Sequence, residues 1–311
     1  MPFRPSPRQL EYLIALCETG HFGAAARLCH VSQPTLSTQL QLLEEQLGAT
    51  LIDRSPGRAR LTPTGEQVIV LARTALASLD EIVGVSRHSA GQLGGLIRLG
   101  VAPTFGPYYL PHLLPHLHGV YPDLEIYIRE DRPQALEMTV ADGSIDCALA
   151  PQPEDRDRLE YRELLIETLH LGMASDHPLA KADQVRADML AGERMLTLGP
   201  GHRLSRSVRA LCAESGAILR EEYEGTSLDA LRQMVSIGMG LSLFPDLYAA
   251  SEFARREEQV VLRQIVDWPL KRSVGLYWRK GHVRGAHFGR FGEECRRIAD
   301  EIGGGRGKAL A

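Results

Sequence analysis

A row of uncharged, hydrogen-bonding side chains near the amino end carries the most specific chemistry in this sequence. Its members are Gln33, Thr35, Ser37, Thr38 and Gln41, and Pro34 lies among them as a further candidate contact to DNA. A helix that meets only water usually mixes Glu and Lys on its outer face. A helix inserted into the major groove of DNA instead needs donors and acceptors for base edges. We therefore interpret the row as a base-reading surface, with Gln33 suited to adenine N6 and N7 and Thr35 to a thymine methyl group.

The surrounding sequence predicts a helix-turn-helix at about 22–41. Small and apolar residues at helical spacing form the first helix: Phe22, Ala25, Ala26 and Cys29. The turn is expected at His30 and Val31, after which Ser32 would cap the second helix. The inner stripe of that helix is Leu36, Leu40, Leu43 and Leu47. A plain helical hairpin with a polar face is the alternative, but the small residues before the turn and the capped polar helix favour DNA reading.

The run RQLEYLIALCETGHFGAAARLCHVSQPTLSTQLQLLEEQLGATLIDR resembles the amino-terminal domain of LysR-type transcriptional regulators, and the resemblance extends over almost the whole chain. It implies an α + α/β fold: a winged helix-turn-helix, a long dimerisation linker helix, and a two-lobed α/β effector domain like a periplasmic binding protein. The expected boundaries are 5–62 for the DNA-binding domain and 63–93 for the linker helix and hinge. The effector domain would cover 94–303, and a flexible tail 304–311.

A basic hairpin, or wing, is predicted after the helix-turn-helix, where short apolar pairs flank a Pro56-Gly57 turn. Arg54, Arg58 and Arg60 would place guanidinium groups on phosphates or in the minor groove. A solvated basic loop is the alternative, but DNA contact is favoured beside a helix-turn-helix.

A long helix follows, beginning at Thr62 or Thr64 and reaching about Arg87. Its apolar repeat of 3.5 residues comprises Val68, Ala72, Ala75, Leu79 and Ile82. We interpret this repeat as the seam of a dimer, which would bring two helix-turn-helix units to the half-sites of an imperfect palindrome. A core helix within one domain is the alternative. The family resemblance further implies a homotetramer and contact with RNA polymerase.

From residue 96 onward, predicted strands alternate with helices, as in α/β domains. Strands are expected at 96–101, 124–129, 146–150, 169–174, 195–198, 219–223, 241–244 and 272–278, and helices at 109–117, 134–141, 204–214, 228–236 and 288–302. The resemblance implies lobe I at about 94–166 and 269–303 and lobe II at about 167–268, with crossings near Ile166 and Trp268.

Ligands of open α/β sheets collect at the carboxyl ends of strands, near helix N-termini. The candidate effector-binding residues at such positions are Thr104, Pro133, His202, Arg203, Thr226 and Ser227. For any hydroxyl taken alone, helix capping is the alternative. Their joint placement predicts a site for a small polar or anionic effector.

Within the family, the segments GSIDCALA, GHRLSRSVRALC and TSLDALRQMVSIGMGLSLFP resemble OxyR-type peroxide-responsive activators. That resemblance places a reactive cysteine after Gly201-His202 and a second cysteine nine residues later. These positions hold Arg203 and Cys212 here, so a disulfide between them is impossible. Pro133 also stands where the resemblance places a threonine of the peroxide pocket.

Two sensing hypotheses remain open. In the first, a small effector controls the regulator, and Arg203 holds its carboxylate or phosphate group. In the second, Cys212 senses oxidant by forming a sulfenic acid or a bond to another chain, helped by Arg206 and Arg209. The place of Cys212 in an amphipathic helix favours an inert thiol and hence the first hypothesis.

Composition limits the other functions. The net charge of −4 over 311 residues argues against indiscriminate polyanion binding, so DNA contact would rest on a local patch. The sequence shows no signal peptide or membrane-spanning run, and its five cysteines lack metal spacing, so we expect a cytoplasmic protein with reduced thiols. No G-x-S-x-G motif or P-loop supports an enzyme, and a solute binder is a further alternative. His112 and His116 share a helical face without a third ligand, so neither metal nor cofactor is expected.

Overall fold

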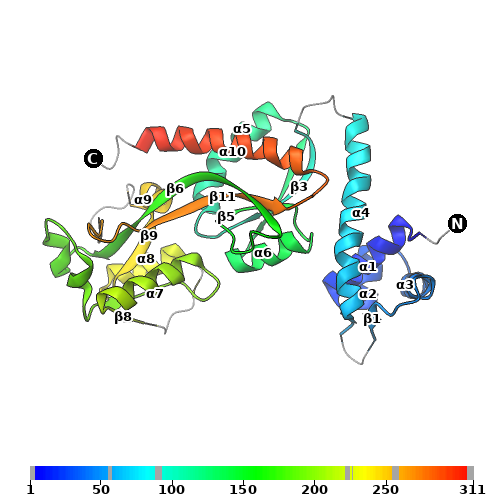
Figure 1. Ribbon diagram of the computed structural model, residues 1–311, viewed down its shortest axis with the longest axis horizontal. Coiled ribbons are helices and arrows are strands. Elements are labelled where there is room, and N and C mark those ends of the chain that lie inside the picture. Colours follow the sequence, from blue (N-terminus) through cyan, green and yellow to red (C-terminus); the bar gives the residue numbers. More distant parts are fainter. Residues whose placement is uncertain are drawn as a thin grey trace. The chain divides into compact units, whose positions relative to one another are not determined.

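The computed structural model describes residues 4–54, 58–87, 93–220, 225, 227–253 and 259–306. The chain divides near residue 92 into an amino-terminal unit and a larger carboxy-terminal unit (Figure 1). Each unit has its own hydrophobic core.

The amino-terminal unit begins with three helices whose ends follow from their capping residues. They are α1 (Pro7–Thr19), α2 (Phe22–Leu28) and α3 (Gln33–Leu47). The side chain of Ser6 accepts the Gln9 N–H and caps α1, and Gly20 ends that helix in the left-handed conformation. Ser32 caps α3 by accepting the Thr35 N–H, as predicted.

One face of α3 supplies the core of this unit. Leu36, Leu40 and Leu43 are fully buried against α1 and α2, and burial of each leucine stabilises the fold by roughly 1.5–3 kcal/mol. The inner stripe was expected to continue to Leu47, but that residue is 38% exposed because it lies in the last turn, next to the terminating Gly48.

The predicted wing and long helix follow. β1 (Ile52–Asp53) pairs antiparallel with β2 (Arg60–Leu61), and the Pro56-Gly57 turn lies outside the described residues. The helix α4 (Pro63–Arg87) begins where the Thr62 hydroxyl accepts the Gly65 N–H at 3.0 Å. A side chain at Gly65 would collide with the Leu51 carbonyl oxygen, so glycine allows α4 to pack closely on the wing.

The carboxy-terminal unit is built on one sheet of seven described strands in the order β10-β6-β11-β5-β3-β4, with β9 also paired to β6. The strands are β3 (Gly95–Val101), β4 (Leu124–Glu130), β5 (Cys147–Pro151), β6 (Leu159–Ala174), β9 (Ser242–Pro245), β10 (Val260–Arg263) and β11 (Lys271–Arg279). A separate short pair joins β7 (Arg194–Met195) to β8 (Ile218–Leu219).

Two lobes form because β6 extends through two cores. Its first part pairs with β11, and its last residues pair with β9 and β10. Leu164 belongs to the core of lobe I with Phe105 and Phe291, whereas Leu171 belongs to the core of lobe II with Val208. Figure 1 shows β6 and β11 side by side along this unit.

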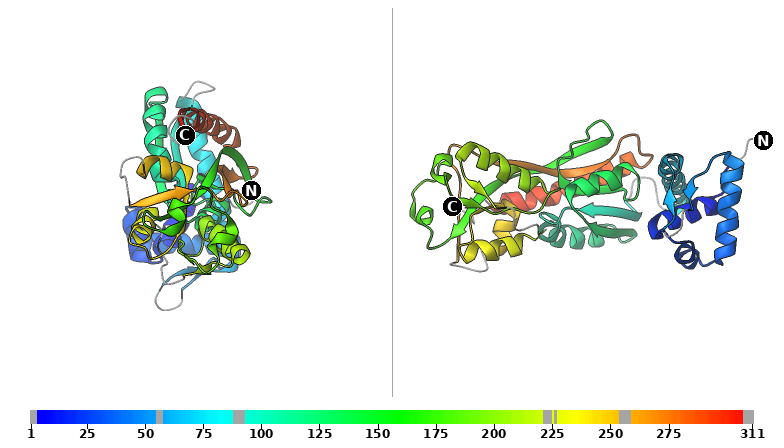
Figure 2. Two further views of the ribbon diagram at one scale, coloured as in Figure 1. Left: turned by 90° about the vertical axis from the view of Figure 1, so that its left-hand side faces the viewer. Right: turned by 90° about the horizontal axis from the view of Figure 1, so that it is seen from below.

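Helices cover the sheet in both lobes. They are α5 (Gly106–Val120), α6 (Pro133–Ala141), α7 (Arg203–Ser215), α8 (Leu228–Ser236), α9 (Asp246–Glu252) and α10 (Gly285–Arg306), with short 3-10 helices η1 (Pro178–Lys181) and η2 (Ala187–Leu190). The red helix α10 lies beside α5 in lobe I (Figure 2). The helices α7 and α8 belong to lobe II.

Candidate functional site

The uncharged row on α3 lies on the surface of the amino-terminal unit. Gln33, Pro34, Thr35, Thr38 and Gln41 are exposed, and Ser37 is half-buried. The hydroxyl of Thr35 lies 2.7 Å from that of Ser32, so its polar atom takes part in the helix cap. The arrangement leaves amides, hydroxyls and a methyl group on the face opposite the leucine stripe.

Arg54 and Arg58, the predicted phosphate ligands, are both attached to the body of the domain. The Arg54 guanidinium lies 2.8 Å from Glu44 and 5.8 Å above the ring of Phe22. The Glu44 carboxylate also accepts two backbone N–H groups at β1, so Arg54 is oriented while its side chain stays 41% exposed. Arg58 is exposed and packs against Gly20, where an added Cβ would lie 2.3 Å from its Nε.

Thr104, which follows the end of β3, is 3% exposed and already has a protein partner. Arg272 donates to its hydroxyl and to its carbonyl oxygen, each at 2.9 Å. The same guanidinium pairs with the fully buried Glu167, whose other oxygen accepts the Leu247 N–H at 2.9 Å. Thr104 therefore belongs to a buried ion-pair network where the strands pass between the lobes.

His202 precedes α7 and is 4% exposed. Neither of its ring nitrogens has a hydrogen-bond partner among the described residues. Burial, with the charge of Arg132 as a smaller cause, lowers the pKa of His202 to about 4. The imidazole is therefore neutral at physiological pH and retains one donor and one acceptor.

Arg203 begins α7 and is held by lobe I. Its Nη2 donates to Glu137 of α6 at 2.5 Å, and its Nη1 contacts Glu154, which lies between β5 and β6. Arg206, one turn farther along α7, contacts the same oxygen of Glu154. The arginine at the position of the expected reactive cysteine thus joins the two lobes through carboxylates.

The other predicted effector residues do not converge with these. Pro133 is buried at the start of α6, and Thr226 lies outside the described residues. Ser227 caps α8 by accepting the Ala230 N–H at 3.3 Å. Helix capping was the alternative to effector binding for this hydroxyl. Ser227 also lines a cavity of about 540 Å³ beside Tyr108 and Glu130, whereas His202 and Arg203 line a different cavity of about 230 Å³.

Sequence reasoning missed the partners of these residues: Glu137, Glu154, Glu167 and Arg272. Each is a charged residue in a strand, a helix or a connecting segment without a motif. No local pattern distinguishes them from surface charges, because their partners lie 49 to 168 residues away along the chain.

Cys212 has the surroundings of an unreactive thiol. It packs in the core of lobe II, and burial raises its pKa, although the Arg209 charge acts in the opposite direction. A raised pKa lowers the thiolate fraction that would attack peroxide. Cys147 and Cys295 are also buried, and burial raises the pKa of each.

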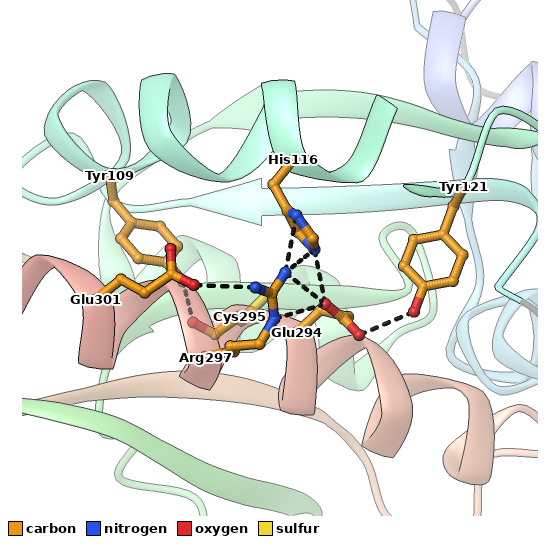
Figure 3. Close-up of polar contacts among 7 residues, drawn as sticks. All are labelled: Tyr109, His116, Tyr121, Glu294, Cys295, Arg297 and Glu301. Atoms are coloured by element: carbon orange, nitrogen blue, oxygen red, sulfur yellow. Dashed lines mark hydrogen bonds and ion pairs between the residues drawn. The ribbon is translucent and has the colours of Figure 1, made fainter. Parts of the chain in front are cut away.

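His116, considered as half of a metal pair, instead connects α5 to α10 (Figure 3). Its Nε2 lies 2.8 Å from a Glu294 oxygen, and the other Glu294 oxygen accepts the Tyr121 hydroxyl at 2.8 Å. Arg297 contacts the His116 ring and donates to Glu301 at 2.9 Å. These bonds fix the carboxy-terminal helix on lobe I.

Within the described ranges, no helix is both long enough and apolar enough to cross a lipid bilayer.

Comparison with known proteins identifies both units. Residues 7–66 match the bacterial regulatory helix-turn-helix protein family, lysR family, and residues 90–300 match the LysR substrate binding domain. The DNA-binding transcriptional dual regulator OxyR of Escherichia coli K12 is 34% identical over 293 residues, 94% of this chain and 95% of that protein. The HTH-type transcriptional regulator EstR of Acinetobacter baylyi is 31% identical over 276 residues, 89% and 91% of the two chains.

Solved structures agree with these matches. A full-length OxyR variant from Pseudomonas aeruginosa superposes with a TM-score of 0.76 at 29% identity, covering 94% of this chain and 98% of that chain. A peroxide-bound OxyR mutant from Corynebacterium glutamicum gives a TM-score of 0.65 at 30% identity, covering 97% and 94%. The chain therefore belongs to the LysR family of DNA-binding transcriptional regulators, with a helix-turn-helix domain and an effector-binding domain.

Proposed function

We propose that this regulator is switched by a small polar or anionic effector that binds in the carboxy-terminal unit, and not by a peroxide-driven disulfide. The observation that carries the proposal is the environment of Arg203. Its guanidinium occupies the place of the expected reactive cysteine and is bound by two carboxylates. Arginine has no thiol to oxidise, and burial makes the remaining Cys212 a weak nucleophile.

The DNA-bound form is proposed to be a pair of chains joined through α4. Three large apolar residues of this helix are exposed: Leu71 at 68%, Leu79 at 41% and Ile82 at 67%. With Ala75 they follow one face, which is suited to a second copy of the helix. We further propose that such pairs bind imperfect palindromic promoter sites in the cytoplasm, assemble into homotetramers and contact RNA polymerase.

The second candidate is peroxide sensing through Cys212. It is favoured by the 34% identity to relatives named hydrogen peroxide-inducible genes activators and by the Arg209 charge, which lowers the pKa of the thiol. Burial has the larger effect on that pKa and opposes this candidate.

Mass spectrometry of the full chain after brief peroxide exposure distinguishes the two candidates. The effector proposal predicts an unmodified Cys212 thiol and unchanged promoter binding. Rapid sulfenylation of Cys212, together with altered promoter binding that is abolished by Cys212→Ser, would establish the peroxide sensor instead.

We also propose that the lobes bind their ligand without transforming it, as expected for a LysR-type regulator. Deletion of residues 1–62 tests this. A regulator loses promoter occupancy, whereas an enzyme would keep a turnover activity.

A further inference from the structure

Two guanidinium groups converge on a single carboxylate oxygen at the start of α7. The Nη1 atoms of Arg203 and Arg206 both contact Oε1 of Glu154. Arginine guanidinium groups bind carboxylates strongly through charge-assisted hydrogen bonds. In this chain the carboxylate in that position is the protein's own.

The two carboxylates around Arg203 differ in how firmly they are held. The Glu137 side chain is 12% exposed, and its second oxygen accepts the backbone N–H groups of Glu154 at 2.9 Å and Asp155 at 3.4 Å. It therefore shapes the segment between β5 and β6. The Glu154 side chain is 58% exposed, and its described contacts are with the two arginines. The hydrogen bond from Arg206, followed by that from Arg203, holds the pKa of the Glu154 carboxyl group below its ordinary value.

A cavity of about 230 Å³ adjoins this ion pair. Its charged lining residues are Glu137, Glu154, Arg203, Arg206 and Arg209. Its uncharged polar lining consists of Gln134, Ser205 and the buried, neutral His202. Amide, hydroxyl and imidazole groups can all donate to an anion, and the N-terminal end of α7 adds a favourable dipole. The space suits a small organic acid, and Glu154 itself lines it.

We propose that Arg203 and Arg206 form a carboxylate-binding site, that Glu154 occupies it in the ligand-free protein, and that the effector is a small carboxylate that displaces Glu154. This rests on the proposed function and names the class of its effector. The exchange keeps both arginines paired, because an incoming carboxylate replaces a carboxylate, and the displaced Glu154, whose side chain is already 58% exposed, is solvated by water.

Displacement would also change how the lobes are joined. Glu154 belongs to lobe I, and α7 belongs to lobe II, so their contact is one link between the lobes. A ligand that binds Arg203 and Arg206 in place of Glu154 has a higher affinity for the arrangement of the lobes in which the contact between Glu154 and α7 is broken. That difference in affinity is what a ligand needs to shift the conformational equilibrium.

The test compares the full chain with Glu154→Gln in succinate titrations by calorimetry at pH 7. Removal of the competing carboxylate is expected to tighten succinate binding about fivefold, which corresponds to about 1 kcal/mol. Arg206→Gln in the Glu154→Gln background should reverse that gain. Glu214→Gln, an equal charge change at an exposed position of α7, is the matched control and should leave binding unchanged.

Equal succinate affinity in the wild-type chain and in Glu154→Gln would overturn the proposal, as would the absence of heat in every variant. A gain of the same size for Glu214→Gln would show a nonspecific charge effect and would also overturn it. Promoter binding by the same preparations is measured in parallel. If promoter binding is retained while succinate binding fails, the error lies in the ligand class and not in the assignment as a regulator.

Discussion

At the scale of single residues, the exposed row on α3 and the anchored Arg54 predict different kinds of DNA contact. Gln33 is an exposed amide at the start of the helix, suited to one base edge. Arg54 is exposed but tied to Glu44, so its charge is oriented without being matched to a particular base. Base contacts specify sequence, whereas phosphate contacts contribute affinity for every sequence.

Gln33→Ala is accordingly expected to relax preference at one base pair, with a loss of about 1–3 kcal/mol of discrimination there. Arg54→Ala should weaken binding to all duplexes and reduce the dependence of affinity on salt. Competition assays with single-base operator variants at two salt concentrations measure both effects. Identical, position-specific losses in both variants would disprove this division of roles.

His202 predicts a pH dependence of stability. Its pKa is about 4 in the folded chain against an ordinary value of 6.5, so between these values the unfolded chain holds a proton that the folded chain lacks. Stability therefore rises with pH through this window and is lost as pH falls from 6.5 toward 4. The shift corresponds to at most about 3 kcal/mol.

His202→Gln should therefore flatten the pH dependence of urea unfolding between pH 6.5 and 4. Tryptophan fluorescence reports the relevant unit, because Trp268 and Trp278 both lie in the carboxy-terminal unit. The exposed His118→Gln is the control and should retain the full slope. His282, whose pKa is also about 4, is expected to supply the pH dependence that remains in His202→Gln. A slope that His202→Gln leaves unchanged would mean that His202 does not cause it.

The sequence could not predict the surroundings of these residues. Thr104 has the residue type and position of a ligand-binding hydroxyl, yet Arg272, 168 residues away, binds it. Arg203 was expected to hold an external anion, whereas Glu137 and Glu154 bind it in the structure. In both cases the partner of the residue depends on tertiary packing.

At the scale of elements, local signals predicted the helices well. Capping residues correctly predicted the starts of α1 and α3. The helix expected at 228–236 is α8, which covers the same residues. The first part of β6 was missed because 159–168 carries alternating charges that resemble a surface segment. Its strand conformation comes from pairing with β11, more than 100 residues later. Neither β10 nor α9 was predicted, and the strand expected at 195–198 pairs only at Met195 in β7.

The apolar repeat on α4 has two roles rather than one. Ala72 of the predicted seam is buried in the core of its own unit, and Val68 packs against that core. The exposed stripe is therefore Leu71, Ala75, Leu79 and Ile82.

Leu79→Glu is expected to separate the dimer, since it places a charge in the seam. Sedimentation equilibrium should show a lower mass and a concentration-dependent return toward the wild-type value. Gln46→Glu adds the same charge at an exposed position of α3, outside the seam, and should keep the wild-type mass. A wild-type mass for Leu79→Glu at micromolar concentration would place the dimer contact elsewhere.

At the scale of the whole molecule, the chain combines a LysR-type DNA-binding domain with two lobes that are connected by ion pairs and not by a disulfide. The Arg203 cluster links α6 and the β5–β6 segment to α7, and the Arg272 network links the strands that pass between the lobes. Neither network contains a cysteine.

The most direct test is a footprint of the full chain on its preferred promoter duplex before and after brief peroxide treatment. The account predicts the same protected region and the same affinity in both samples, with preference over random duplex at moderate salt. A footprint that lengthens, shortens or moves after peroxide, and returns on reduction, would contradict it.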